Sequence, residues 1–107
     1  MVLRQMLEGE GHEVIEARHG REALVLYDRV SIDIIITDIF MPAMDGIETI
    51  KELGKRKPRP KIIAISGGGS FDPDGMLDMA KHLGARQTLA KPFTSEEISA
   101  AIRAVWP

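Results

Sequence analysis

Two short runs of β-branched residues constrain the fold more than any other feature of the chain. The run "DIIIT" occupies residues 33–37, and "KIIAIS" occupies residues 61–66. Both are continuously apolar rather than alternating, which is typical of strands covered on both faces in a parallel sheet. Between them, "GIETIKELGKRKPRP" has apolar residues at helical spacing and ends in a basic, proline-broken stretch. The sequence therefore predicts a strand, a helix and a second parallel strand at the centre of a sheet.

The rest of the chain continues this alternation of strands and helices. "HEVIEA" (12–17) is expected to form a strand near one edge, and "RQTLAK" (86–91) a short last strand. Apolar residues at helical spacing predict helices within 21–30, 73–83 and 94–106, the last opened by a capping box from Thr94 to Glu97. This pattern predicts an α/β fold in which a parallel sheet of four strands is flanked by helices, with right-handed crossovers.

Length and composition narrow the functional classes. With 107 residues, the chain has room for one domain, 1–107, with one core. Its net charge of −2 gives no basic surplus for a phosphate backbone, so direct nucleic-acid binding is not expected. The absence of cysteine excludes disulfides and thiolate chemistry. No apolar run approaches the roughly 20 residues of a membrane span, so we expect a cytoplasmic protein with no membrane partner.

Three polar residues follow the predicted strands at the points where these strands end. They are Asp38, Ser66 and Lys91. Ligands of parallel sheets bind at the carboxyl ends of the strands, so these side chains are expected to share one site. A carboxylate can attack phosphorus while a hydroxyl and an ammonium steady the oxygens, which points to a phosphoryl group. Taken singly, each has a simpler interpretation: Asp38 as a helix cap or turn residue, Ser66 as a strand end, and Lys91 as a solvated charge.

Together, "TDIFMPAMDG", "IIAISG" and "LAKPF" resemble the receiver domain of bacterial two-component response regulators, of the chemotaxis type. The resemblance covers essentially the whole chain. It implies a flavodoxin-like sheet in the order 2-1-3-4-5, with helices on both faces. It also implies a signalling module, not an enzyme, that accepts a phosphoryl group from a sensor histidine kinase or a phosphotransfer protein. The chain has neither a P-loop nor a dinucleotide fingerprint, and turnover of a small substrate is not expected.

The resemblance assigns roles around the phosphoryl group. Asp38 would be the phosphoacceptor, Ser66 the hydroxyl that contacts the phosphoryl group, and Lys91 its counter-charge. The backbone of Gly67 would also contact the phosphoryl oxygens. Asp45 with Gly46 is interpreted more simply, as a turn that leads into a helix.

The resemblance also implies how a magnesium ion would be bound and whether an aromatic side chain would act as a conformational switch. Mg²⁺ would be held by Asp38, the backbone carbonyl of Phe40, waters and an acidic pair after the first strand. The peptide bond from Lys91 to Pro92 is expected to be cis, against a base rate of about 5–6% for prolyl bonds. Thr88 stands where receivers often have a switch aromatic residue, so the usual rotation of an aromatic ring is expected to be absent.

One part of the family pattern is missing from the sequence. No strand with an acidic pair precedes "MVLRQMLEGEG", which resembles the back half of the first helix. Either the chain is an N-terminally truncated form, or two copies exchange strands as a homodimer, or the sheet closes with four strands. Weak or absent Mg²⁺ binding and impaired phosphorylation of Asp38 are therefore expected. The alternative is a pseudo-receiver that serves as a protein-interaction or dimerisation module independent of phosphorylation.

Overall fold

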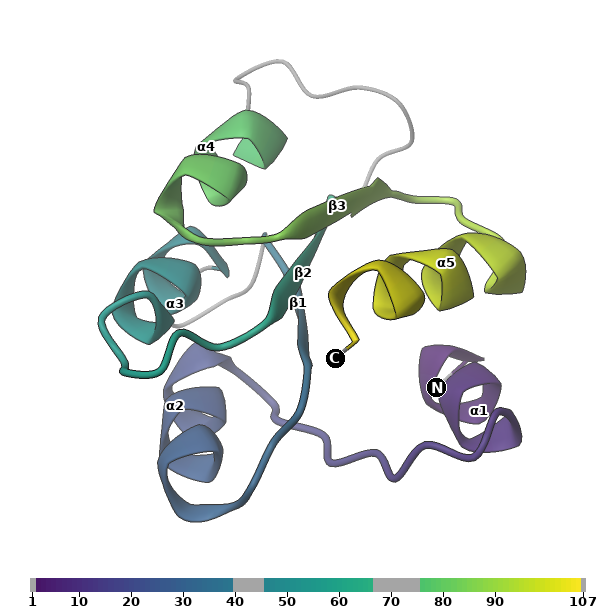
Figure 1. The fold of residues 1–107 in the computed structure, drawn as a ribbon, viewed down its shortest axis with the longest axis horizontal. Helices are drawn as coiled ribbons and strands as arrows, with labels where there is room; N and C mark the ends of the chain where they lie inside the picture. Colours follow the sequence, from purple (N-terminus) through teal and green to yellow (C-terminus); the bar gives the residue numbers. More distant parts are fainter. Residues whose placement is uncertain (1, 40–45, 67–75, 107) are drawn as a thin grey trace.

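A single parallel sheet lies between two layers of helices in the computed structural model, which describes residues 2–39, 46–66 and 76–106 (Figure 1). Within these residues the sheet has three strands in the order β1-β2-β3. They are β1 (Ile35–Asp38), β2 (Ile62–Ser66) and β3 (Gln87–Ala90). The helices, in chain order, are α1 (Val2–Gly9), α2 (Gly20–Arg29), α3 (Gly46–Leu53), α4 (Met76–Leu83) and α5 (Ser95–Val105).

The two faces of the sheet bury separate apolar clusters. Alternate residues of a strand point to opposite faces, so Ile62 and Ala64 join one cluster and Ile63 joins the other. The first cluster packs under α2, α3 and α4, and the second under α1 and α5 (Figure 1). Because β2 is covered on both faces, its residues Ile62–Ile65 are at most 3% exposed. This confirms the interpretation of the "KIIAIS" run as a doubly covered strand.

Most of the predicted elements are found at the expected positions. The strands predicted within 33–37, 61–66 and 86–91 correspond to β1, β2 and β3. At the start of α5, the Thr94 hydroxyl accepts from the Glu97 N–H at 3.1 Å, and the Glu97 carboxylate accepts from the Thr94 N–H at 3.0 Å. The predicted capping box is therefore confirmed.

The prediction of a fourth strand at 12–17 is wrong. This segment has no strand pairing, although Val14 packs against the cluster under α1 and α5. In the order 2-1-3-4-5 its ladder partner would be a first strand, and the described residues contain no strand in that place. A strand without a partner leaves its backbone groups to water, so an extended coil is the stable result. Among residues 2–39, 46–66 and 76–106 the sheet has three strands rather than four, and the homodimer by strand exchange stays a prediction.

The place of the missing first strand also borders β1, so the side of β1 that faces away from β2 has no partner strand among the described residues. Ile34, Ile35 and Ile36 are half-buried, whereas Ile62 and Ile63 of the neighbouring strand are at most 1% exposed. The N–H of Ile35 donates to Lys61 O and that of Ile39 to Ile65 O, so the intervening Ile36 directs its N–H away from β2. Within the part of the chain that the structure describes, no strand covers that side.

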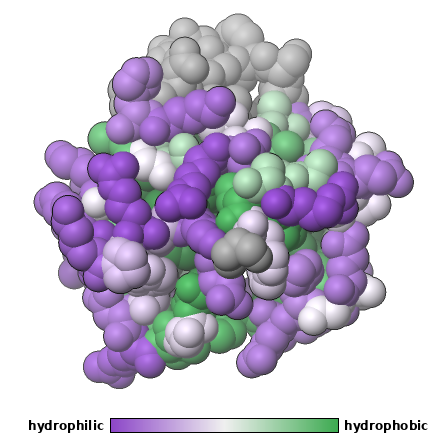
Figure 2. Space-filling view, viewed as in Figure 1, coloured by the Kyte–Doolittle hydropathy of each residue, from purple (hydrophilic) through white to green (hydrophobic). Residues whose placement is uncertain are grey.

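On the face drawn in Figure 2, hydrophilic residues cover most of the surface and apolar ones show between them. None of the helices among the described residues combines the length and the apolarity that crossing a membrane requires.

Candidate functional site at the carboxyl ends of the strands

Asp38 is the last residue of β1, and its neighbours fix its backbone. Its Cα partner across the sheet is Ile65, and the next residue, Ile39, donates its N–H to the Ile65 carbonyl at 2.9 Å. The buried Thr37 donates its hydroxyl to the Asp38 carbonyl at 3.1 Å. The Asp38 side chain is 30% exposed. A backbone held by hydrogen bonds on both sides of Asp38 thus presents a carboxylate that solvent can reach.

Gly46, the first residue of α3, packs directly on this backbone. Its N–H donates to the Ile39 carbonyl at 3.1 Å. A Cβ at Gly46 would lie only 2.0 Å from the Asp38 carbonyl oxygen and 2.3 Å from the Ile39 Cα. Glycine is therefore required for α3 to begin against the end of β1. The sequence indicated only a turn at Gly46. The steric requirement could not be predicted, because it arises from how closely α3 approaches β1.

Lys91 follows β3 and places a cation beside the carboxylate. Its Nζ lies 3.1 Å from Asp38 Oδ2, although the two residues are 53 positions apart in the chain. The peptide bond between Lys91 and Pro92 is cis, as the resemblance implies. Because the two side chains are 49% and 30% exposed, water screens their attraction, and the pair contributes little to stability. The pair instead indicates where an anionic group bound to Asp38 would find its counter-charge.

The third predicted strand-end residue shares this edge through its backbone. Ser66 ends β2, and its Cα partner is Ala90, the residue before Lys91. The structure describes the backbone of Ser66 but not its side chain, and Phe40 and Gly67 lie outside the described residues. The hydroxyl role of Ser66, the carbonyl role of Phe40 and the backbone role of Gly67 therefore stay predictions.

Thr88 lies in the middle of the strand that leads to Lys91. It is half-buried, and its Cα partner is Ala64, which belongs to the cluster under α2, α3 and α4. Its neighbour Leu89 packs in the opposite cluster, so Thr88 is on the α4 side of the sheet. A threonine here has no aromatic ring that could rotate between the surface and the interior.

The described residues do not by themselves fit a magnesium site. Mg²⁺ takes oxygen ligands and usually combines one or two carboxylates with waters and phosphate oxygens. Across 2–39, 46–66 and 76–106, no group of three or more ligating side chains is found. The carboxylate of Asp38 is also paired with Lys91.

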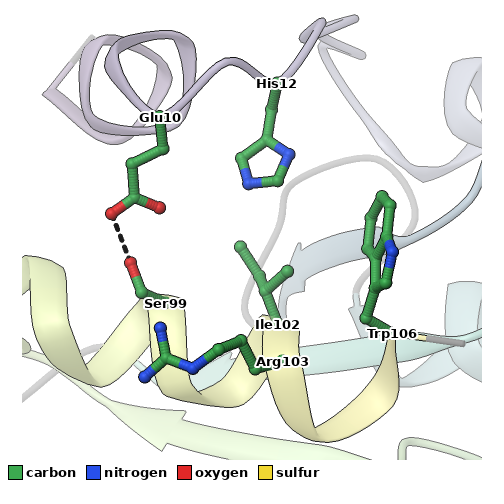
Figure 3. A pocket seen from close by; sticks show the side chains of 6 residues that line it. All are labelled: Glu10, His12, Ser99, Ile102, Arg103 and Trp106. Carbon is green, nitrogen blue, oxygen red and sulfur yellow. Dashed lines mark hydrogen bonds between the residues drawn. The ribbon is translucent and has the colours of Figure 1, made fainter.

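A separate hollow of about 390 Å³ lies between the end of α1 and α5 (Figure 3). There the Ser99 hydroxyl donates to the Glu10 carboxylate, and the rings of His12 and Trp106 lie 5.9 Å apart, tilted by 50°. These contacts join the segment after α1 to α5. The hollow is lined by neither Asp38 nor Lys91, so it is distinct from the strand-end site.

Comparison with known proteins identifies one family. The family described as response regulator receiver domain matches residues 1–103. The chain is 38% identical to the chemotaxis protein CheY of Thermotoga maritima over 106 residues, which cover 98% of this chain and 86% of that protein. It is also 38% identical over 104 residues to the transcriptional regulatory protein CpxR of Escherichia coli K12, covering 97% of this chain. The chain spans only 43% of the length of that CpxR protein.

Solved structures show the same fold. The putative response regulator of Chloroflexus aurantiacus superposes with a TM-score of 0.85 at 27% identity, covering 97% of this chain and 84% of that one. The chemotaxis protein CheY4 of Vibrio cholerae gives 0.81 at 29% identity, covering 97% and 86%. The receiver domain of the sensor histidine kinase PA1611 from Pseudomonas aeruginosa gives 0.84 at 25% identity, covering 97% and 84%, and was solved with magnesium in its active-site cleft.

Proposed function

The chain belongs to the response regulator receiver family, and on that premise we propose that Asp38 accepts a phosphoryl group from a phosphohistidine. The family has the flavodoxin-like fold, and its members are signalling modules of two-component systems. The donor would be a sensor histidine kinase or a phosphotransfer protein, and we propose that the transfer takes place in the cytoplasm. The observation that carries the proposal is the pairing of Asp38 with Lys91 at the shared end of β1 and β3.

The proposed reaction needs a carboxylate nucleophile and a nearby cation. A carboxylate oxygen of Asp38 attacks phosphorus and forms an O–P bond. The P–N bond to the donor imidazole breaks, and that ring keeps the electron pair and takes a proton from water. Such transfers depend mainly on positioning and on charge neutralisation. Lys91 Nζ, at 3.1 Å from Asp38 Oδ2, is placed to hold an oxygen of the transferred group.

Removing the Lys91 charge is expected to slow this reaction. Replacing Lys91 with methionine keeps most of the side-chain length but removes the counter-charge. We expect the rate of phosphoryl incorporation on Asp38 to fall by roughly 10²-fold, as when one charge-stabilising donor is lost. The measurement is the incorporation rate from acetyl phosphate, followed by gel mobility. Lys81→Met, at an exposed position of α4, is the matched control and should keep the full rate. An unchanged rate in Lys91→Met would contradict the role.

We also propose that this polypeptide binds Mg²⁺ weakly and is phosphorylated slowly. The support is the incomplete set of metal ligands among the described residues. Even the loss of an outer partner of a metal ligand costs about 10–100-fold in affinity, so a missing carboxylate ligand should cost at least as much. Calorimetric titration beside the PA1611 receiver domain, which was solved with magnesium, should show Mg²⁺ affinity at least about tenfold weaker for this chain. Equal affinities would contradict the proposal.

A second candidate function follows from the incomplete set of metal ligands among the described residues, taken together with Thr88. A receiver in which few metal ligands are described, and in which Thr88 replaces the aromatic residue of the switch position, is expected to convert phosphorylation into a conformational change less effectively. We therefore retain the pseudo-receiver alternative, in which the chain binds a protein partner or a second copy without phosphate. The segment 73–106, which includes α4, β3 and α5, is the expected surface for that role.

A further inference from the structure

The hollow drawn in Figure 3 lies between the segment after α1 and helix α5. Its volume is about 390 Å³, and its lining is mainly apolar. Ile102 projects from α5 into it, and the rings of His12 and Trp106 stand beside Ile102 (Figure 3). Ile102 belongs to the apolar cluster under α1 and α5, so the hollow is on the side of the sheet opposite to α4.

Trp106, the only tryptophan of the chain, leaves a large aromatic surface in water at the rim of this hollow. Its side chain is 48% exposed. Its backbone N–H donates to the Ile102 carbonyl at 2.9 Å, and its ring lies 5.9 Å from the ring of His12. These contacts hold the indole in place, so little freedom is lost when a second molecule covers it. Tryptophan and arginine are the residues most enriched among those that dominate protein–protein binding.

Two opposite charges line the same hollow without neutralising each other. Glu10 and Arg103 are exposed, and neither forms an ion pair with any other described residue. The Ser99 hydroxyl donates to one oxygen of Glu10 and holds this carboxylate over α5 (Figure 3). An anionic ligand would be repelled by Glu10, and a cationic ligand by Arg103. A second copy of the same surface fits better, because each charge can then meet its opposite.

We propose that this hollow and its rim pair two copies of the chain about a two-fold axis. In the dimer, the Trp106 ring of each copy enters the hollow of the other, and Glu10 of each copy pairs with Arg103 of the other. Such a contact uses the same patch of both copies, which two-fold symmetry requires. The proposal involves neither strand exchange nor α4, and it does not depend on phosphorylation. Six residues line the hollow, against roughly 20–30 a side in a standard interface, so we expect a dissociation constant in the micromolar range.

The first test follows the full chain from about 5 µM to about 500 µM by sedimentation velocity and by tryptophan fluorescence. We expect the sedimentation coefficient to rise from that of a monomer to that of a dimer. The emission of Trp106 should shift to shorter wavelength over the same range, because the ring leaves water. A chain that stays monomeric throughout would overturn the proposal, and so would a dimer in which the emission does not shift.

The second test reverses the two charges in separate variants, Glu10→Arg and Arg103→Glu. Each variant brings like charges together in its own dimer, so each should dimerise at least about tenfold more weakly than the unmodified chain. In an equimolar mixture of the two variants, both pairs are again of opposite charge. The mixed dimer should therefore recover to within about threefold of the original affinity. This recovery also shows that each variant is folded, because a damaged surface could not be restored by its partner.

Three further variants complete the test. Trp106→Ser should weaken dimerisation at least about tenfold. Lys81→Glu reverses one charge at an exposed position of α4 and should change the affinity by less than about twofold. Asp38→Asn should leave dimerisation unchanged, which separates this proposal from the phosphorylation proposal. A mixture of the two charge-reversed variants that associates no better than either one alone would overturn the proposal, and so would an equal loss in Lys81→Glu or in Asp38→Asn.

Discussion

Replacing Asp38 with asparagine is expected to abolish phosphoryl incorporation into the chain. The amide has nearly the same shape as the carboxylate, but its oxygen is a far weaker nucleophile and carries no charge. The backbone around Asp38 should be unaffected, because the Thr37 hydroxyl donates to the Asp38 carbonyl and the Ile39 N–H donates to the Ile65 carbonyl, and neither bond involves the Asp38 side chain. The measurement is incorporation from acetyl phosphate over a long incubation, since the unmodified chain is itself expected to react slowly.

The matched control for this variant is Asp33→Asn. Asp33 is an exposed aspartate just before β1, at the other end of the strand from Asp38. The Asp33→Asn variant should leave phosphoryl incorporation unchanged. Incorporation that survives in Asp38→Asn but falls in Asp33→Asn would contradict the assignment. Partner binding that is independent of Asp38→Asn would favour the pseudo-receiver alternative instead.

Replacing Gly46 with alanine is expected to destabilise the fold at the site itself. The added Cβ would overlap the Asp38 carbonyl oxygen and the Ile39 Cα, both of which belong to backbone that cannot rotate away. Overpacking of this kind costs typically 1–3 kcal/mol, so we expect the free energy of unfolding to fall by about 2 kcal/mol. For a chain of this size that is a drop in Tm of roughly 10 °C. Chemical denaturation and thermal melting both measure it.

Gly9→Ala is the matched control for Gly46→Ala. Gly9 ends α1, and nothing lies within 4 Å of a Cβ built on it. Alanine favours helix over glycine by about 1 kcal/mol, so this variant should be neutral or slightly stabilised. Phosphorylation of Asp38 should fall in Gly46→Ala, because α3 must shift away from β1, and stay unchanged in Gly9→Ala. An undisturbed Tm in Gly46→Ala would show that the helix approaches the strand less closely than the structure has it.

The strands β1 and β2 could be predicted from the sequence because their pattern is local, although β1 lies at the edge of the described sheet rather than at its centre. Continuous β-branched runs at 33–37 and 61–66 are characteristic of strands buried on both faces, and both formed strands. The run "HEVIEA" has an equally strand-like local pattern but did not form one. Whether a strand forms depends on a hydrogen-bonding partner, and a partner cannot be inferred from the pattern of the segment itself.

One part of the candidate site could likewise be predicted from the sequence, and another part could not. We predicted that polar residues at the strand ends would converge. Asp38 and Lys91 do so, with Lys91 Nζ lying 3.1 Å from Asp38 Oδ2. The steric requirement at Gly46 and the hydrogen bond from Thr37 were not predicted. Both depend on how closely two elements approach in space, which spacing along the chain does not encode. A glycine directly after the Asp-x-x-Met-Pro-x-Met-Asp motif was the only available signal, and a turn explained it equally well.

The most direct test of the account is to locate the phosphoryl group. The chain is incubated with a phosphohistidine-bearing phosphotransfer protein, the acyl phosphate is reduced with borohydride, and the peptides are sequenced by mass spectrometry. We expect reduction to convert Asp38, and no other aspartate, to homoserine. Modification of a different aspartate, or of a histidine, under conditions in which the CheY relative is modified at its own aspartate would contradict it.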